Sequence, residues 1–182
     1  MDRIGFVLTL GALAAISATA IDVCIPALPE IGRTLGASPE AGAALISGYL
    51  LGYGPGQLIW GPLSDRFGRM GLLYLSLIGF VATSLACALA GSLDFLVAMR
   101  FLQGVTGGGA PAIARAIARD QGGGAETARL ISSITIIIGG APLIAPLIGS
   151  GLLAIADWRW IFVFLMLFGL MLIGGALTFL GR

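Results

Sequence analysis

GPLSDRFGRM, residues 61–70, is a short charged stretch between two long apolar segments. It holds Asp65, Arg66 and Arg69, and Gly61 and Gly68 permit tight backbone turns within it. An irregular turn cannot satisfy its backbone groups in hydrocarbon, so the stretch must lie at a membrane surface and join two spans. Because Lys and Arg in short loops favour the cytoplasmic side, we expect this loop to lie inside, which orients every other segment.

The composition excludes a water-soluble domain. Hydrophobic residues make up 58% of the chain and charged residues 10%, and the mean hydropathy is +1.02, whereas soluble domains carry about 25% charged residues. All ten basic residues are Arg, the net charge is +1, and there is no basic patch for nucleic acid. With no His and only two Cys, we expect no metal site and no cofactor. The chain reads as an integral membrane protein whose main surroundings are the lipid bilayer.

Six stretches are long and apolar enough to span a bilayer, which takes about 20 residues. We expect them at about 4–25, 43–60, 70–90, 96–118, 130–153 and 161–180. The N-terminal stretch has a second interpretation as a cleavable signal peptide ending near 18–20. Against this, Asp2 offsets the charge of Arg3, and the apolar run continues to Ile21.

The distribution of arginines supports this topology, with both termini inside. Only Arg33 and Arg159 fall on the expected outer side, whereas the inner side receives Arg3, Arg66, Arg69, Arg115, Arg119, Arg129 and Arg182. This asymmetry orients the chain and carries no information about function.

Ionisable residues within spans are costly and indicate functional sites by default. Arg100 lies inside the fourth span with Gln103 three residues on, on the same helix face. One interpretation is that these two residues line a substrate or proton pathway. The other is that Arg100 is an interhelical clamp that binds backbone carbonyls or an acid on a neighbouring helix. Asp22, near the end of the first span, either exchanges protons as its surroundings change or is an interfacial residue.

The charges of residues 61–70 have two interpretations. Asp65 can accept hydrogen bonds at a helix N-terminus, and Arg66 and Arg69 can pair with acids of the 119–126 loop, for which Asp120 and Glu126 are available. Such pairs would hold one conformation and break in another. Alternatively, the arginines only set the topology.

Glycine and proline mark two spans for close or bent packing. Gly48, Gly52 and Gly56 recur every four residues and predict a flat stripe for a neighbouring helix. The fifth span combines two prolines with several glycines, which predicts a locally bent, thin helix. One interpretation is that this helix seals the protein against leak or bends during transport. The other is that its glycines and prolines reflect ordinary small-residue packing. Its residues of this kind are Gly139, Gly140, Pro142, Pro146, Gly149 and Gly151.

Together these segments resemble the major facilitator superfamily. Residues 61–69 resemble its signature between helices two and three. Residues 100–104 (RFLQG) resemble the helix-four motif of drug/proton antiporters, and residues 145–149 (APLIG) resemble the helix-five motif of the same antiporters. Residues 21–29 (IDVCIPALP) and the pair Arg119-Asp120 look closest to the bicyclomycin/chloramphenicol-resistance branch. Cys24, Ala145 and Ser150 depart from the family pattern, which bears on substrate range and on the helix-five seal.

The resemblance implies a role for each motif residue. It makes Asp22 a candidate for proton coupling and Arg100 one for binding or proton relay, and it joins Asp65, Arg69 and Asp120 in a cytoplasmic gate. Helices one and four would line the cavity, and the substrate would be a small amphipathic drug-like compound exchanged for protons across a bacterial inner membrane.

The resemblance also implies an all-α membrane fold of two inverted three-helix repeats, residues 1–91 and 92–182, within a single domain spanning 1–182. That is one half, the N-terminal one, of a two-half transporter. We therefore expect the polar face of Asp22, Arg100 and Gln103 to need a covering second half, either another copy or a separate C-terminal half. The rival interpretation is a non-transporting half-domain or membrane scaffold. Nothing in the sequence favours an enzyme.

Overall fold

The protein is an all-helical bundle in the part of the chain that the structure describes. The structure is a computed structural model and describes residues 3–36, 38, 41–121 and 123–181, without the side chains of Ala41 and Glu126. Its elements in order are α1 (Arg3–Asp22), a 3₁₀ turn (Ile25–Ala27), α2 (Leu28–Thr34), α3 (Ala41–Phe67), α4 (Arg69–Ala88), α5 (Leu93–Gly107), α6 (Gly109–Asp120), α7 (Ala125–Ile155), α8 (Arg159–Gly175) and a π turn (Ala176–Leu180).

The six expected spans correspond to six long helical segments. α5 and α6 together form the fourth, divided at Gly108, whose N–H still donates to the Gly104 carbonyl at 2.9 Å. By length and composition, four segments of the described residues qualify as membrane spans, namely Arg3–Thr34, Arg69–Ala88, Thr127–Ile155 and Arg159–Leu180. α3 is less apolar because it is rich in glycine, proline and tyrosine, and α5 and α6 are each too short to span alone.

Short caps and turns separate the helices. The Ser92 hydroxyl accepts a hydrogen bond from the Phe95 N–H at 3.4 Å and begins α5, and the Asp157 carboxylate accepts one from the Arg159 N–H at 2.9 Å at the start of α8. Gly68 joins α3 to α4 at φ +97°, a conformation that favours glycine.

The expectation that residues 61–70 form a loop is wrong for most of its length. α3 continues through Gly61 and Pro62 to Phe67, and Gly68 alone separates it from α4. A continuing helix satisfies its own backbone hydrogen bonds at the membrane surface, and the fixed φ of proline is compatible with a helix. Only Gly68 of the two expected turn glycines adopts a positive φ.

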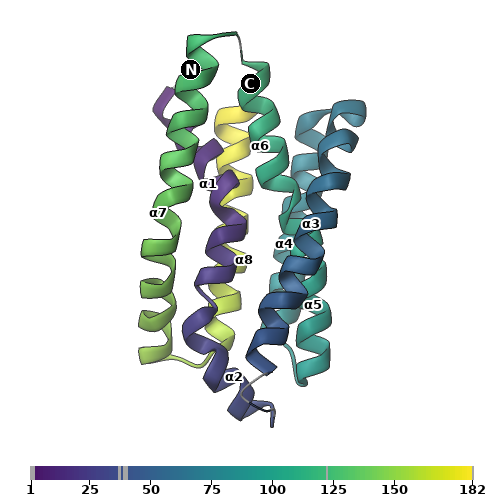
Figure 1. The fold of residues 1–182 in the computed structure, drawn as a ribbon, viewed down its shortest axis with the longest axis vertical. Coiled ribbons are helices and arrows are strands. Elements are labelled where there is room, and N and C mark those ends of the chain that lie inside the picture. The colour runs from purple at the N-terminus through teal and green to yellow at the C-terminus, as the bar shows by residue number, and fades with distance from the viewer. Residues whose placement is uncertain (1–2, 37, 39–40, 122, 182) are drawn as a thin grey trace.

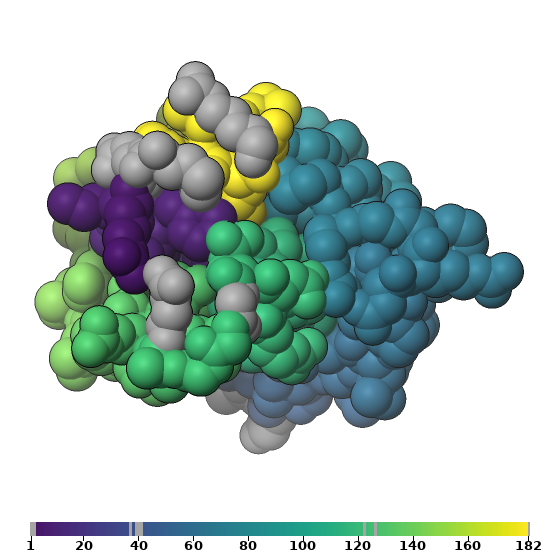
Figure 2. All heavy atoms as spheres, turned by 90° about the horizontal axis from the view of Figure 1, so that it is seen from above, coloured from purple at the N-terminus to yellow at the C-terminus, as the bar shows by residue number. Residues whose placement is uncertain are grey.

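Both termini, the α3–α4 junction and the α6–α7 connection lie at one end of the bundle, and α2 lies at the other (Figure 1). Seen from the first end, the segment around the α3–α4 junction projects sideways from the bundle (Figure 2). This arrangement agrees with an even number of spans.

Helix pairing joins the two halves of the sequence. α3 packs most extensively on α5, α1 on α7 and α4 on α8. In chain order, α1, α3 and α4 of the first half correspond to α5 with α6, α7 and α8 of the second half. Under this correspondence, the α3–α5 pair becomes the α7–α1 pair, and the α4–α8 pair maps onto itself. An inverted pair of three-helix repeats would produce this pattern.

The glycine stripe on α3 makes the closest helix contact. A Cβ placed at Gly52 would lie 2.0 Å from the Phe101 carbonyl oxygen, and one at Gly56 would lie 2.5 Å from that of Val105. From the facing helix, a Cβ at Gly104 would lie 2.1 Å from the Tyr49 carbonyl oxygen. The predicted flat stripe is therefore confirmed, and it sets the position of the helix that carries Arg100.

Candidate functional site

Arg100 occupies the centre of a buried polar cluster. It lies on α5, and none of its surface is exposed. One terminal nitrogen donates to the Gln103 Oε1 at 2.7 Å, and the other donates to the Ala20 carbonyl on α1 at 3.3 Å. Its guanidinium carbon lies 4.5 Å from the centre of the Tyr49 ring on α3 and 5.8 Å from that of Phe162 on α8. The cation is thus held by carbonyl oxygens and aromatic faces from four helices.

Gln103 extends the cluster to α4. Its Nε2 donates to the Ser84 hydroxyl at 2.7 Å, and that hydroxyl donates to the Phe80 carbonyl at 2.7 Å. Two buried polar atoms of the cluster, Nε of Arg100 and the Tyr49 hydroxyl, make no hydrogen bond within the described structure. Buried polar groups without a partner are rare because each one costs free energy, so these two atoms mark the cluster as unusual.

The burial of Arg100 and Gln103 corrects one expectation. Both side chains are fully covered by this chain's own helices, so neither needs a second half to cover it. The sequence places them correctly on one face of the helix, as their mutual hydrogen bond shows. It could not show that Tyr49 and Phe162, from distant parts of the chain, close over that face.

Asp22 lies apart from the cluster. It is the last residue of α1, two positions beyond the Ala20 carbonyl that Arg100 holds, and its side chain is half-buried. Among the described residues, no hydrogen bond or ion pair joins Asp22 to Arg100. The structure therefore links the two through the end of α1 rather than by direct contact.

A second charged cluster ties together three helix ends at the end of the bundle that holds the termini. The Arg69 Nε donates to the Asp120 Oδ2 at 3.0 Å, and its NH1 donates to the Ser64 hydroxyl at 2.9 Å and to the Asp65 carboxylate. These contacts join the end of α3 and the start of α4 to the end of α6, as expected for Arg69 and Asp120.

Asp65 does not cap a helix N-terminus as expected. It lies in the last turn of α3 and accepts from the Arg69 side chain, and within the described chain no side chain caps α4. The Arg66 guanidinium carbon lies 5.3 Å from the centre of the Phe67 ring. Arg119 lies beside Asp120 in the last turn of α6, and the Glu126 side chain lies outside the described set.

Sequence reasoning missed a line of polar side chains between α3 and α6. The Tyr53 ring stacks on Tyr49 with centroids 6.3 Å apart, and its hydroxyl accepts from the Gln57 amide. The Gln57 Oε1 accepts from Arg115 NH2 at 3.0 Å. The signal was available, because Tyr49, Tyr53 and Gln57 recur every four residues and therefore share one face of a helix. The line connects the buried Arg100 cluster to the charged end of α6.

The fifth span is one continuous helix, α7, with Pro142 and Pro146 inside it. Gly149 makes the close contact, since a Cβ there would lie 2.3 Å from the Val23 carbonyl oxygen just beyond α1. A Cβ at Gly139, Gly140 or Gly151 would meet nothing within 4 Å. Of these four glycines in α7, only Gly149 is therefore a point of close helix contact.

The two clusters place charged side chains inside the bundle and at the end that holds the termini. Within the described residues, no group of three or more His, Cys, Asp or Glu side chains could hold a metal ion.

Comparison with protein families gives a match over nearly the whole chain. The model described as "Major Facilitator Superfamily" matches residues 10–182. The chain is 37% identical over 174 residues to an "Uncharacterized MFS-type transporter YdgK" of Bacillus subtilis (strain 168), covering 94% of this chain and 43% of the relative.

Two further relatives have names that describe drug resistance. A "Bicyclomycin resistance protein homolog" of Haemophilus influenzae is 33% identical over 166 residues, covering 91% of this chain and 42% of the relative. "Multidrug resistance protein D" of Escherichia coli (strain K12) is 32% identical over 164 residues, covering 90% of this chain and 42% of the relative. The chain thus spans less than half the length of these curated relatives.

Solved structures share the fold. The proton:xylose symporter XylE superposes with a TM-score of 0.83 at 17% identity, covering 96% of this chain and 44% of that one. The human organic anion transporter MFSD10 superposes with a TM-score of 0.77 at 18% identity, covering 99% of this chain and 48% of that one.

Proposed function

Because this chain belongs to the major facilitator superfamily, whose members are integral membrane proteins, we propose that it forms the N-terminal half of a proton-coupled multidrug exporter. The exporter would exchange a small amphipathic drug-like compound for protons by alternating access. Relatives named for bicyclomycin and multidrug resistance favour this substrate class. The second half would come from a C-terminal segment, a separate chain or a second copy.

The observation that carries the proposal is the Arg69 bridge between Asp65 and Asp120. It fastens the α3–α4 junction to the end of α6, two helix ends that can separate only if the bridge breaks. The carboxylates are more than half exposed, so the bridge is weak enough to open during a transport cycle. In this role it closes the cytoplasmic side when formed.

Asp22 is the proposed proton-coupling residue. It is half-buried at the end of α1, where a change in its surroundings can change its protonation. Arg100, held inside the bundle, acts through the Ala20 carbonyl to position the end of α1. Gly149 supports the same end of α1 from α7, where close packing would seal the pathway beside Pro146.

The proposed location is a bacterial inner membrane with both termini in the cytoplasm. The inner side would then be the end of the bundle that holds Arg69 and Arg119. The excess of arginines at that end follows the preference of cytoplasmic loops for positive charge.

The decisive experiment is drug efflux by the assembled transporter in proteoliposomes with an imposed proton gradient. We expect Asp22→Asn to abolish proton-driven efflux and to retain drug binding. Asp94→Asn, which removes a carboxylate from the first turn of α5, is the matched control and should transport normally. Unchanged proton-driven efflux by Asp22→Asn would end the assignment of this residue.

The alternative is a non-transporting half-domain or membrane scaffold that needs a partner chain or a second copy. The chain spans less than half the length of the curated relatives, which is the extent of one half-domain. The mass of the purified particle in nanodiscs, with lipid subtracted, separates the two. A dimer makes a symmetric two-half transporter feasible, whereas a monomer without transport supports the half-domain.

A further inference from the structure

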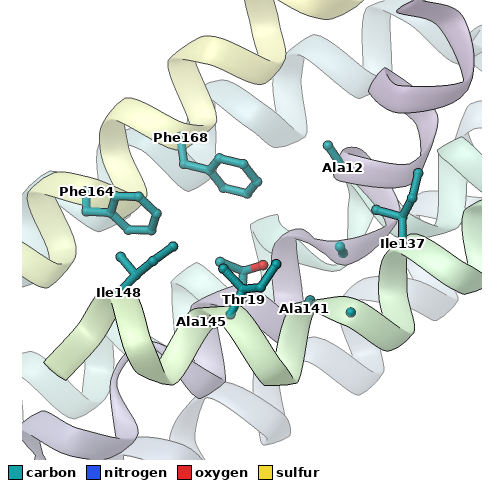
Figure 3. A pocket seen from close by; sticks show the side chains of 11 residues that line it. Ala12, Thr19, Ile137, Ala141, Ala145, Ile148, Phe164 and Phe168 are labelled. Atoms are coloured by element: carbon teal, nitrogen blue, oxygen red, sulfur yellow. The ribbon is translucent and has the colours of Figure 1, made fainter. Parts of the chain in front are cut away.

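α7 and α8 leave an apolar groove where they pass each other. α7 packs chiefly on α1, and α8 packs chiefly on α4, so the two helices make little contact with each other. The resulting cavity has a volume of about 350 Å³, and α1 contributes small side chains, Ala12 and Ala15, to its lining. Figure 3 shows Phe164 and Phe168 projecting from α8 toward the residues of α7.

The lining is unfavourable for water as the occupant. Thr19 supplies the single side-chain polar group among the residues that line the cavity. A buried water needs about two to four polar partners. An unfilled cavity would forfeit the dispersion contacts of its walls. Hydrocarbon is the medium that fits both requirements.

The groove opens to the outside of the bundle. α7 and α8 both lie in segments that qualify as membrane spans, and Ile144, in the wall of the groove, is 59% exposed. The groove is therefore continuous with the exposed surface of these two helices. The described residues that line it include no charged side chain, which matches an uncharged hydrocarbon partner.

An aromatic stripe leads into the groove from one membrane surface. Trp160, Phe164 and Phe168 recur every four residues along α8 and so share a face. Trp160 is 53% exposed near the helix start, a place where tryptophan sits at the headgroup level. The rings of Phe164 and Phe168 are parallel within 6°, with centroids 6.1 Å apart, and form a flat wall.

We propose that this groove is a lipid site that holds one acyl chain of a phospholipid from the leaflet at the Trp160 end. The chain passes Trp160, lies along the two phenyl rings and reaches the alanine floor of α1. The site is independent of the transport mechanism, because it needs only that α7 and α8 span the bilayer and that the second half leaves the groove uncovered.

Photolabelling tests the site directly. The protein, together with its second half where one accompanies it, is reconstituted in phosphatidylethanolamine and phosphatidylglycerol vesicles. These contain a phosphatidylethanolamine with a diazirine in one acyl chain. After irradiation, mass spectrometry locates the label. We expect several-fold more label on Ile148, Phe164 and Phe168 than on the outward-facing Leu167 and Met171.

Two matched variants locate the occupant. Ala141→Phe adds bulk to the groove from α7 and should lower the groove label several-fold, whereas Leu167→Phe adds a ring to the outward face of α8 and should leave it unchanged. If Ala141→Phe fails to fold, Ala12→Leu fills the same space from α1.

Three outcomes would overturn the proposal. Equal labelling of the groove and the outward face would mean ordinary bilayer contact. An unlabelled groove would assign it to the second half of the protein. Loss of the groove label on adding an excess of a lipophilic drug, with the outward label retained, would assign it to the drug.

Discussion

Replacing Gly52 with alanine tests the close packing of α3 on α5. The added Cβ would lie 2.0 Å from the Phe101 carbonyl oxygen and 3.0 Å from the Val105 backbone nitrogen. Both neighbours are backbone atoms, so no side chain can rotate away. To reach ordinary van der Waals contact, the helices must separate locally by about 1.4 Å. Overpacking of this kind costs about 1–3 kcal/mol, and close packing is what holds membrane helices together.

The assay uses the protein's own thiols. Cys24 and Cys87 are free and buried, so a thiol-reactive dye reports unfolding on heating in detergent. For a chain of this size, each kcal/mol lowers Tm by about 2–4 °C, and Gly52→Ala should show a loss of several degrees.

Gly54→Ala is the matched control on the same helix, because a Cβ there meets nothing within 4 Å. Both variants gain the helix preference of alanine, about 0.5–1 kcal/mol, so the difference between them isolates the clash. Equal Tm values for the two variants would refute the close α3–α5 contact.

The remaining predictions use the same dye assay. Arg100→Met leaves two buried carbonyl acceptors without a donor, and each should cost about 1–3 kcal/mol; an unchanged Tm would contradict the clamp. Gly149→Ala should lower Tm by several degrees, because the added Cβ would lie 2.3 Å from the Val23 carbonyl oxygen, whereas Gly151→Ala, whose Cβ would meet nothing within 4 Å, should not. Arg69→Gln combined with Asp120→Asn in a double-mutant cycle should give a coupling of about 0.2–1 kcal/mol that weakens in salt; a larger, salt-insensitive value would show that the bridge is too strong to open readily.

Much of the fold could be predicted because its determinants are local. Apolar length placed the six spans, and the four-residue spacing of Gly52 and Gly56 predicted a close helix contact. The end of α3 was misplaced because glycine, proline and charge indicate a loop by composition, whereas only Gly68 adopts a turn conformation.

The site was predicted in part, for a different physical reason. Residues that share a helix turn, such as Arg100 and Gln103, could be joined from their spacing. Which other helices cover them could not, because Tyr49 and Phe162 reach Arg100 through tertiary packing. The Arg69–Asp120 bridge was anticipated because the two residues fall in loops on the same expected side of the membrane.

The pairing of helices has a consequence for biogenesis. Each of the three most extensive pairings, α3 with α5, α1 with α7 and α4 with α8, joins a helix made before residue 91 to one made after it. During synthesis, the first three helices therefore enter the bilayer before their main partners exist, and only their smaller contacts with one another can hold them together there. The α4–α8 pair forms only after α8 has left the translocation machinery.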